Sequence, residues 1–196
     1  MGMTGKLGTL GYGAELNVGI SDSIIAHIGL NAYTYQYNAN SGAANYDFKL
    51  QLQTASALAD WYPFNGSFRT SAGLLYDNNK ISLDAKPAGG NFIINGVNYS
   101  STQISSLQGT LSFNKVAPYI GIGWGNPVSK GKGWGLVSDI GVLFQGKPKV
   151  DLVVTCVTTC PAQLQTDAAA ENTKLQNDLS GFRWWPVVSI GISYQW

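Results

Sequence analysis

Charged residues are scarce in this sequence. Its 196 residues include 12 Lys and Arg and 11 Asp and Glu, so charged side chains make up only 12% of the chain, about half the share usual for soluble domains. A net charge of +1 provides no basic patch that could neutralise phosphates, which excludes a nucleic-acid partner. The shortage of charge also predicts that much of the surface does not contact water, or relies on uncharged polar groups.

Long hydrophobic runs and cysteines are also rare. No run of about 18 apolar residues occurs, which excludes a transmembrane helix. The two cysteines, Cys156 and Cys160, lie within "TCVTTCP", and no His or further Cys stands near them, so no metal site is predicted. A small disulfide-closed loop formed in an oxidising compartment is the favoured interpretation, with two free thiols as the alternative.

Glycines, aromatics and a repeated alternation are what the sequence does have. It contains 24 glycines together with 7 Phe, 6 Trp and 10 Tyr. Apolar and small or polar residues alternate over most of the chain, which is typical of β-strands. The alternation changes phase near Thr54, where we expect a bulge. The segment from Cys160 to Asp178 lacks alternation and is rich in helix formers, so it predicts the one helix.

The two sides of these strands differ in an unusual way. One side carries Leu, Ile, Val, Ala and aromatics, and the other carries glycines and a few charged groups. The solvent-exposed side of a soluble sheet should be rich in Lys and Glu, but here the polar side is rich in Gly and Ser. The pattern therefore favours a barrel whose apolar side chains contact lipid and whose polar side chains fill a narrow lumen. We therefore predict an all-β fold, a closed antiparallel transmembrane β-barrel of eight strands, with ten as the alternative, spanning residues 1–196 as a single domain. The predicted lumenal polar network consists of Glu15, His27, Asp47, Lys49, Arg69 and Asp139.

Aromatic residues gather at the predicted strand ends. Amphipathic rings fit the headgroup layer of a membrane, so these side chains predict an interfacial girdle. Its members are Tyr76, Trp124, Trp134, Phe144, Trp184, Tyr194 and Trp196.

The final strand has a pattern of its own. Val188, Ile190, Ile192, Tyr194 and Trp196 occupy alternate positions up to the last residue, which resembles the terminal signal read by the bacterial outer-membrane assembly machinery. The phrases "ADWYPFNGSFRTSAGLLYDNNKISL" and "APYIGIGWG" also resemble small proteobacterial outer-membrane proteins of the OmpA, OmpW and opacity-protein type. This resemblance implies a location in the bacterial outer membrane, contacts with its lipids and lipopolysaccharide, and assembly by that machinery. It carries no catalytic motif.

The sequence predicts no enzymatic site and no cofactor. The only histidine, His27, lacks the His-x-Ser arrangement of one family of lipid-processing barrels, so a hydrogen-bonded lumenal filler is the favoured role. Residues 85–106 are interpreted as a long loop with a small hairpin at "FIINGVNY". This loop and the one at 157–182 are expected to carry any specific function, by binding another protein or a neighbouring copy. The alternatives are a narrow channel for small or hydrophobic solutes, a lipid-modifying enzyme, and a soluble lipocalin-like binder.

Overall fold

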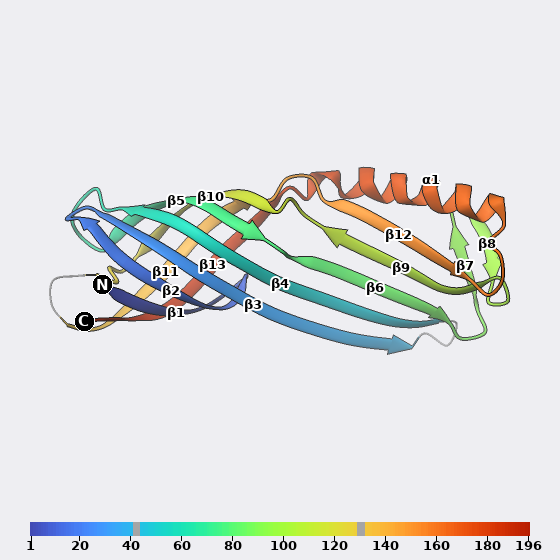
Figure 1. The fold of residues 1–196 in the computed structure, drawn as a ribbon, viewed down its shortest axis with the longest axis horizontal. Helices are drawn as coiled ribbons and strands as arrows, with labels where there is room; N and C mark the ends of the chain where they lie inside the picture. The colour runs from blue at the N-terminus through green and yellow to red at the C-terminus, as the bar shows by residue number, and fades with distance from the viewer. Residues whose placement is uncertain (41–43, 129–131) are drawn as a thin grey trace.

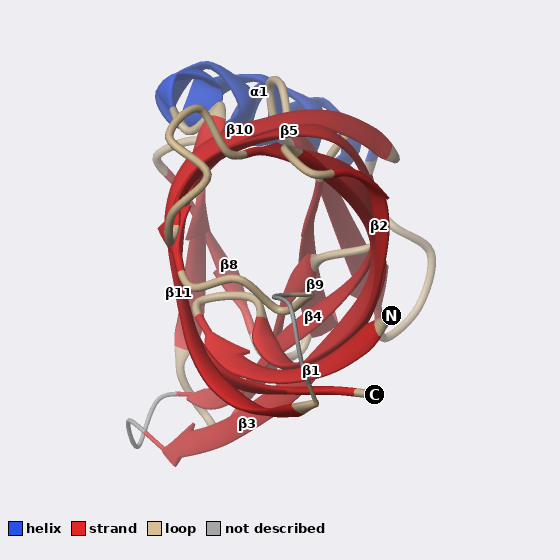
Figure 2. Cartoon of the chain, turned by 90° about the vertical axis from the view of Figure 1, so that its left-hand side faces the viewer, coloured by secondary structure: helices blue, strands red, loops and turns tan. Residues whose placement is uncertain are grey.

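The computed structural model describes residues 1–40, 44–128 and 132–196. Within them, eight antiparallel strands close into a ring, as Figure 2 shows from the end that carries both termini. In ring order the strands are β1 (Gly2–Gly8), β2 (Gly11–Ser21), β3 (Ile24–Asn40), β4 (Ala44–Trp61), β5 (Phe68–Asp77), β10 (Val116–Trp124), β11 (Gly133–Phe144) and β13 (Trp184–Gln195). Pairing of β13 with β1 completes the ring. The predicted eight-stranded barrel is confirmed.

A sheet extension rises from one side of the barrel. β3 and β4 continue far beyond their barrel neighbours and carry three further strands, β6 (Lys80–Pro87), β9 (Ile104–Ser112) and β12 (Lys149–Cys156), as Figure 1 shows. β4 serves both parts, because residues 54–61 pair with β5 and residues 44–51 pair with β6. The extension consists of residues 33–40 of β3, residues 44–53 of β4, the three further strands and the elements packed on them.

The far end of the extension has a core of its own. A hairpin of β7 (Asn91–Ile94) and β8 (Val97–Ser100) and the helix α1 (Ala162–Asp178) pack there, and a short 3-10 turn, η1 (Leu179–Gly181), follows α1 (Figure 1). The buried members of this core are Ala44, Ala85, Phe92, Ile94, Tyr99, Ile104 and Leu164. The predicted helical segment is therefore confirmed, and so is the small hairpin predicted at "FIINGVNY", which is β7–β8. The interpretation of the whole segment 85–106 as a loop is wrong, because most of it lies in β6, β7, β8 and β9.

The polarity of β4 reverses along its length. In the barrel part of β4, Asp60 and Ser56 point into the lumen and Trp61 points outward. In the extension part, the same inner side of the strand carries the buried Leu52. The pairing of β4 with β3 has no irregularity, so the bulge expected near Thr54 is wrong. The alternation changes meaning because the strand leaves the barrel and its inner side becomes part of an apolar core.

Because of this reversal, the predicted lumenal positions of two residues are wrong. Asp47 and Lys49 lie on the upper part of β4, on the exposed side of the extension, and not in the lumen. A charged side chain remains solvated there, whereas the inner side of the same stretch packs apolar groups. The two residues therefore take no part in the lumenal network.

The connections differ between the two ends of the barrel. At the end that holds both termini, β2 and β3 are joined through Asp22 and Ser23. At the other end, β5 and β10 are joined through the extension strands, and β11 and β13 through β12 and α1. None of the helices in the described residues is long and apolar enough to cross a membrane.

Candidate functional site

Six charged side chains form a closed ring of alternating sign inside the barrel. Each contacts two neighbours of opposite charge, and they come from β1, β2, β3, β4, β5 and β11. In order around the ring they are Lys6, Glu15, His27, Asp60, Arg69 and Asp139. We call this set the charge ring. With His27 protonated it holds three cations and three anions, so the buried charges compensate one another.

Lys6 and His27 connect the acidic members on one side of the charge ring. The Nζ atom of Lys6 lies 2.8 Å from Glu15 Oε2 and 2.7 Å from Asp139 Oδ2. The Nδ1 atom of His27 lies 3.3 Å from Glu15 Oε2, and its Nε2 atom lies 3.2 Å from Asp60 Oδ1. Both nitrogens of the imidazole are thus placed against carboxylates, an arrangement that suits the doubly protonated ring.

Arg69 closes the charge ring on the other side. Its Nε atom lies 3.1 Å from Asp60 Oδ2, and its guanidinium donates a hydrogen bond to Asp139 Oδ1. It also donates to the carbonyl of Gly125. Arg69 and Asp60 are each almost completely buried. The guanidinium thus lies between two carboxylates, which compensate its buried charge.

The remaining two strands of the barrel also take part. β13 supplies Ser189, whose hydroxyl donates to Asp139 Oδ2 at 3.2 Å. β10 supplies Gly123, which is in register with both Arg69 and Asp139. A Cβ atom at Gly123 would lie 2.5 Å from Asp139 Oδ1 and 2.9 Å from Arg69 Cζ. The absence of a side chain is therefore what lets these two residues meet across β10.

An apolar cluster fills the lumen on the extension side of the charge ring. Its buried members are Leu10, Leu75, Ala117, Tyr119, Leu143 and Val187, and we call it the apolar plug. A cavity of about 40 Å³, lined by members of both the charge ring and the plug, lies between them. That volume holds a few water molecules.

The terminal end of the barrel is filled as well. Pro127, in the connection from β10 to β11, is buried, and its carbonyl oxygen would lie 2.3 Å from a Cβ atom added at Gly2. Beside it, the side-chain amide of Asn17 donates to Thr4 Oγ1 at 2.9 Å. The lumen is therefore occupied at three levels by residues that the structure describes.

The outer wall of the barrel is apolar. Leu16, Ile122 and Ile190 point outward and are 38%, 39% and 62% exposed. Large aliphatic groups exposed in this way around a closed barrel are what a lipid environment requires and what a water-soluble binding barrel avoids. This arrangement opposes the lipocalin-like alternative.

Exposed aromatic side chains lie at both edges of this wall. All seven predicted girdle residues are exposed. Tyr76, Phe144 and Trp184 lie near the extension end, and Trp124, Trp134, Tyr194 and Trp196 near the terminal end. On β13, Trp184 and Tyr194 are separated by about 33 Å of strand at ~3.3 Å per residue. With a strand tilt of about 40° this spans about 25 Å, the height of the apolar band of a membrane barrel.

The terminal-signal residues follow the same outward pattern. Val188, Ile190, Ile192, Tyr194 and Trp196 are all exposed on the outer side of β13, while Ser193 and Gln195 are buried toward the lumen. The backbone N–H of Trp196 donates to the carbonyl of Met1 at 3.3 Å. The last strand is thus paired on both sides, with β1 and with β11.

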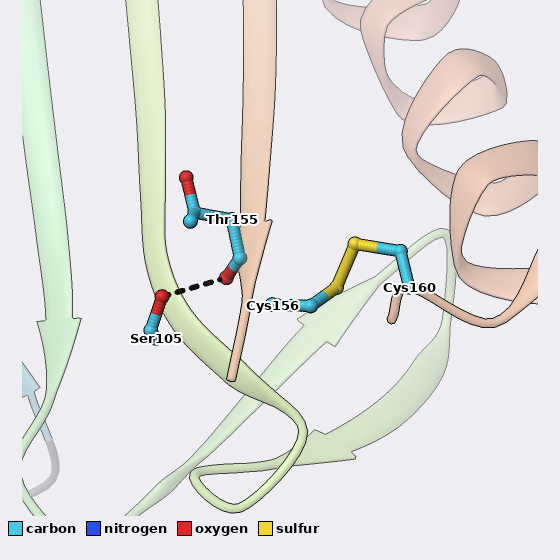
Figure 3. Close-up of a disulfide and its surroundings, with 4 residues drawn as sticks. All are labelled: Ser105, Thr155, Cys156 and Cys160. Atoms are coloured by element: carbon cyan, nitrogen blue, oxygen red, sulfur yellow. Dashed lines mark hydrogen bonds between the residues drawn. A yellow bond between two sulfur atoms is a disulfide. The ribbon is translucent and has the colours of Figure 1, made fainter. Parts of the chain in front are cut away.

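A disulfide fixes the start of α1 to the end of β12. Cys156 and Cys160 are bonded, with Cα atoms 5.4 Å apart (Figure 3). Next to them, the hydroxyl of Ser105 on β9 donates to the carbonyl of Thr155 at 3.1 Å (Figure 3). The bond therefore constrains the point where the chain turns from the sheet into the helix.

A polar cluster attaches the β7–β8 hairpin to α1. Asp167, buried on α1, accepts hydrogen bonds from the hydroxyl of Tyr99, from the side-chain amide of Asn95 at 3.0 Å and from that of Gln163. These donors, the Tyr99 hydroxyl first, lower the pKa of Asp167 below its usual 3.8. The same bond to the carboxylate raises the pKa of Tyr99 from 10.0 to about 12. The backbone N–H of Asn95 also donates to Glu171 Oε2.

Four of the six predicted lumenal residues belong to the charge ring, namely Glu15, His27, Arg69 and Asp139, whereas Asp47 and Lys49 lie on the extension. Lys6 and Asp60, the other two members of the charge ring, were not predicted from the sequence. Asp60 alternates with Ala59 and Trp61, so its inward position was available from the alternation alone. Lys6 lies in the glycine-rich first strand, where the apolar residues are too few to mark the outer side.

No group of three His, Cys, Asp or Glu side chains in residues 1–40, 44–128 and 132–196 is arranged to hold a metal ion. No protein-family model matches the chain. No curated protein sequence matches it either.

The closed ring with its apolar wall defines this chain as a transmembrane β-barrel. Solved structures of the same fold include CarO2 of Acinetobacter baumannii, with a TM-score of 0.64 and 23% identity, and CarO of the same organism, with a TM-score of 0.63 and 25% identity. Each alignment covers 100% of this chain and 97% of the other. Both are outer-membrane barrels. The finer resemblance to OmpA, OmpW and opacity proteins is not supported by these matches and stays a prediction.

Proposed function

We propose that this chain is an outer-membrane protein of a Gram-negative bacterium whose sealed barrel anchors a surface-exposed extension that binds other molecules. In such barrels the termini and short turns face the periplasm and the long connections lie outside. The extension then stands on the cell surface, and the apolar wall contacts lipid and, in the outer leaflet, lipopolysaccharide. The outward residues of β13 are the proposed recognition signal for the assembly machinery.

The charge ring is the observation that carries this proposal. Its members come from six of the eight strands and meet across the lumen, and the apolar plug lies directly above them. A solute would have to separate buried ion pairs and then cross a packed apolar layer, and both steps are costly. The geometry therefore favours an anchor over the alternative of a narrow channel.

The site also gives little support to a lipid-modifying enzyme. Both ring nitrogens of His27 lie against carboxylates, which leaves neither free to activate a hydroxyl nucleophile. We therefore propose that His27 has a structural role.

Recordings in planar lipid bilayers test the sealed barrel. We expect the purified protein to give no stepwise current at neutral pH, in membranes where an open general porin gives regular steps. Reproducible unitary steps from the wild-type chain would replace the anchor by a channel.

Labelling of intact cells tests the orientation. Lys49→Cys on the extension and Lys132→Cys at the terminal end both replace exposed residues. A membrane-impermeant maleimide should label the first variant on intact cells and the second only after the outer membrane is opened. The reverse pattern would contradict the proposal.

A further inference from the structure

The upper part of β3 has a free edge. β3 pairs with β2 only as far as Ala32 opposite Tyr12, yet it continues to Asn40 with β4 as its only remaining neighbour in the described sheet. Residues 33–39 therefore form an edge strand in the extension. We propose that this edge is a docking site for an extended peptide segment of another protein, which adds to the sheet as a further strand.

The register shows which backbone groups the edge presents. The N–H of Tyr62 donates to the carbonyl of Ser23 at 2.8 Å, so odd-numbered residues of β3 direct their backbone groups toward β4. Because these directions alternate along an antiparallel strand without irregularity, the even-numbered residues Thr34, Gln36 and Asn38 direct their N–H and C=O groups toward the open edge. An extended peptide backbone is the ligand whose donors and acceptors match that spacing.

The side chains at this edge favour the same ligand. Tyr33, Tyr35 and Tyr37 lie on the inner side of the sheet and are 38%, 45% and 56% exposed. They are in register with Leu52, Leu50 and Phe48 of β4, so an apolar aromatic surface continues up to the free edge. A peptide strand with an apolar residue at every second position would place those side chains against the tyrosines.

The opposite edge of the extension sheet, unlike the β3 edge, is covered. β12 is the last strand on that side, and α1 lies along it (Figure 1). The side-chain amide of Gln176 on α1 accepts from the N–H of Val150 at 3.0 Å and donates to the carbonyl of Pro148. Lys149 and Asp151 add charge there. Residues 33–39, by contrast, contain no charged residue and no proline, two features that often block a free edge.

A second copy of this chain is a poorer occupant. Two copies anchored in one membrane share the same orientation, so both β3 strands run outward and meet in parallel about a two-fold axis along the membrane normal. Their tyrosine sides would then lie on opposite faces of the joined sheet. A peptide segment from another protein has no such restriction.

Binding of a labelled peptide to the purified full chain tests this inference, which rests on the proposed surface role of the extension. The probe is a fluorescent peptide with the sequence of residues 44–53, "ANYDFKLQLQ", which pairs with the other edge of β3 in the fold. We expect its fluorescence anisotropy to rise with protein concentration. A scrambled peptide of the same composition, without the alternation, should bind at least tenfold more weakly.

Two matched variants locate the site. Gln36→Pro removes an N–H that points to the open edge while leaving the β4 ladder intact, as an edge strand tolerates, and Gln36→Thr keeps that N–H. We expect the proline variant to lose at least tenfold in affinity and the threonine variant to stay within twofold of the wild type. Unchanged heat-modifiable migration of both variants on gels verifies that they fold.

Each other outcome overturns the inference. These are no binding to the wild type, equal binding of the scrambled peptide, or equal binding to Gln36→Pro. A dimer of the chain that dissociates on Gln36→Pro would also overturn it, by making a second copy the occupant. The cell-labelling experiment with Lys49→Cys is independent, so failure of the surface role and failure of peptide docking are distinguishable.

Discussion

Arg69 on β5 and Asp139 on β11 form an ion pair across β10, above the bare backbone of Gly123. The pair joins strands that are not neighbours, so it fixes the curvature of the barrel wall as well as the charges in its lumen. The absence of a Cβ atom at Gly123 leaves room for the Arg69 guanidinium and the Asp139 carboxylate to come into contact.

Removing the Arg69 guanidinium should destabilise the barrel strongly. Arg69→Leu leaves Asp60 and Asp139 buried with one cationic neighbour fewer each, a change that costs about 3–5 kcal/mol for buried pairs. The temperature at which the folded gel band converts to the unfolded band measures the loss. Lys49→Ala is the control, because Lys49 is exposed on the extension, and it should change stability by less than about 0.5 kcal/mol. Equal conversion temperatures for Arg69→Leu and wild type would contradict a structural role for the charge ring.

A methyl group at position 123 should separate the same pair without removing a charge. In Gly123→Ala the new Cβ atom would lie 2.5 Å from Asp139 Oδ1 and 2.8 Å from the carbonyl of Ser138, so overpacking should cost about 1–3 kcal/mol. Gly5→Ala is the matched variant, because nothing lies within 4 Å of its Cβ position. Urea unfolding in detergent, followed by tryptophan fluorescence, compares the two. The idea fails if both variants unfold at the same urea concentration.

Reduction of the disulfide should loosen the extension only. Cys156 and Cys160 are four residues apart, and closing so short a loop is worth about 2 kcal/mol in the chain-entropy model. We expect Cys156→Ser/Cys160→Ser to increase amide hydrogen exchange at the start of α1 while the barrel strands stay protected. Faster exchange throughout the barrel would show that the bond supports more than the β12–α1 connection.

The attachment of the β7–β8 hairpin to α1 should depend on pH at both extremes. The pKa of Asp167 is lowered by its bond from Tyr99, so its contribution is full above pH 3.8 and is lost as the pH falls below that value. The pKa of Tyr99 is raised from 10.0 to about 12, so the neutral hydroxyl contributes fully below pH 10 and its contribution is lost as the pH rises toward 12.

An environment-sensitive fluorophore attached at Asn98→Cys, on the exposed side of the hairpin, measures this attachment. The signal should change in both pH windows. Adding Tyr99→Phe should abolish the alkaline change and move the acid change to higher pH, because Asp167 loses its strongest donor. If Tyr99→Phe leaves the alkaline change intact, the Tyr99–Asp167 bond is not its cause.

The last residue should matter for assembly more than for stability. Trp196 is exposed on the outer side of β13, so Trp196→Ala removes no buried contact. If it belongs to the assembly signal, the variant should reach the outer membrane in several-fold lower amount, and Trp196→Phe should restore it. The heat-modifiable fraction in isolated outer membranes gives the measurement. Normal assembly of Trp196→Ala would exclude this role.

The sequence by itself determined the inward and outward sides of those barrel strands whose apolar residues alternate clearly. Alternation is a local property of an extended strand, so it could be read for Glu15, Arg69 and Asp139, and for the outward row that ends in Trp196. Together with the shortage of charge it also determined that the barrel is inside out relative to a soluble one.

Only the tertiary structure decided which charges meet and where the membrane wall ends. Strand order and register bring Lys6 against Asp139, 133 residues away, and no local pattern encodes such a partner. The apolar positions of β4 likewise change from even-numbered to odd-numbered residues at Thr54 although its pairing with β3 is regular, so Asp47 points to water and Asp60 into the lumen. The reason is that a period of two fixes the relative sides of a strand, while the neighbours packed against each side determine whether that side is lumen, core or water.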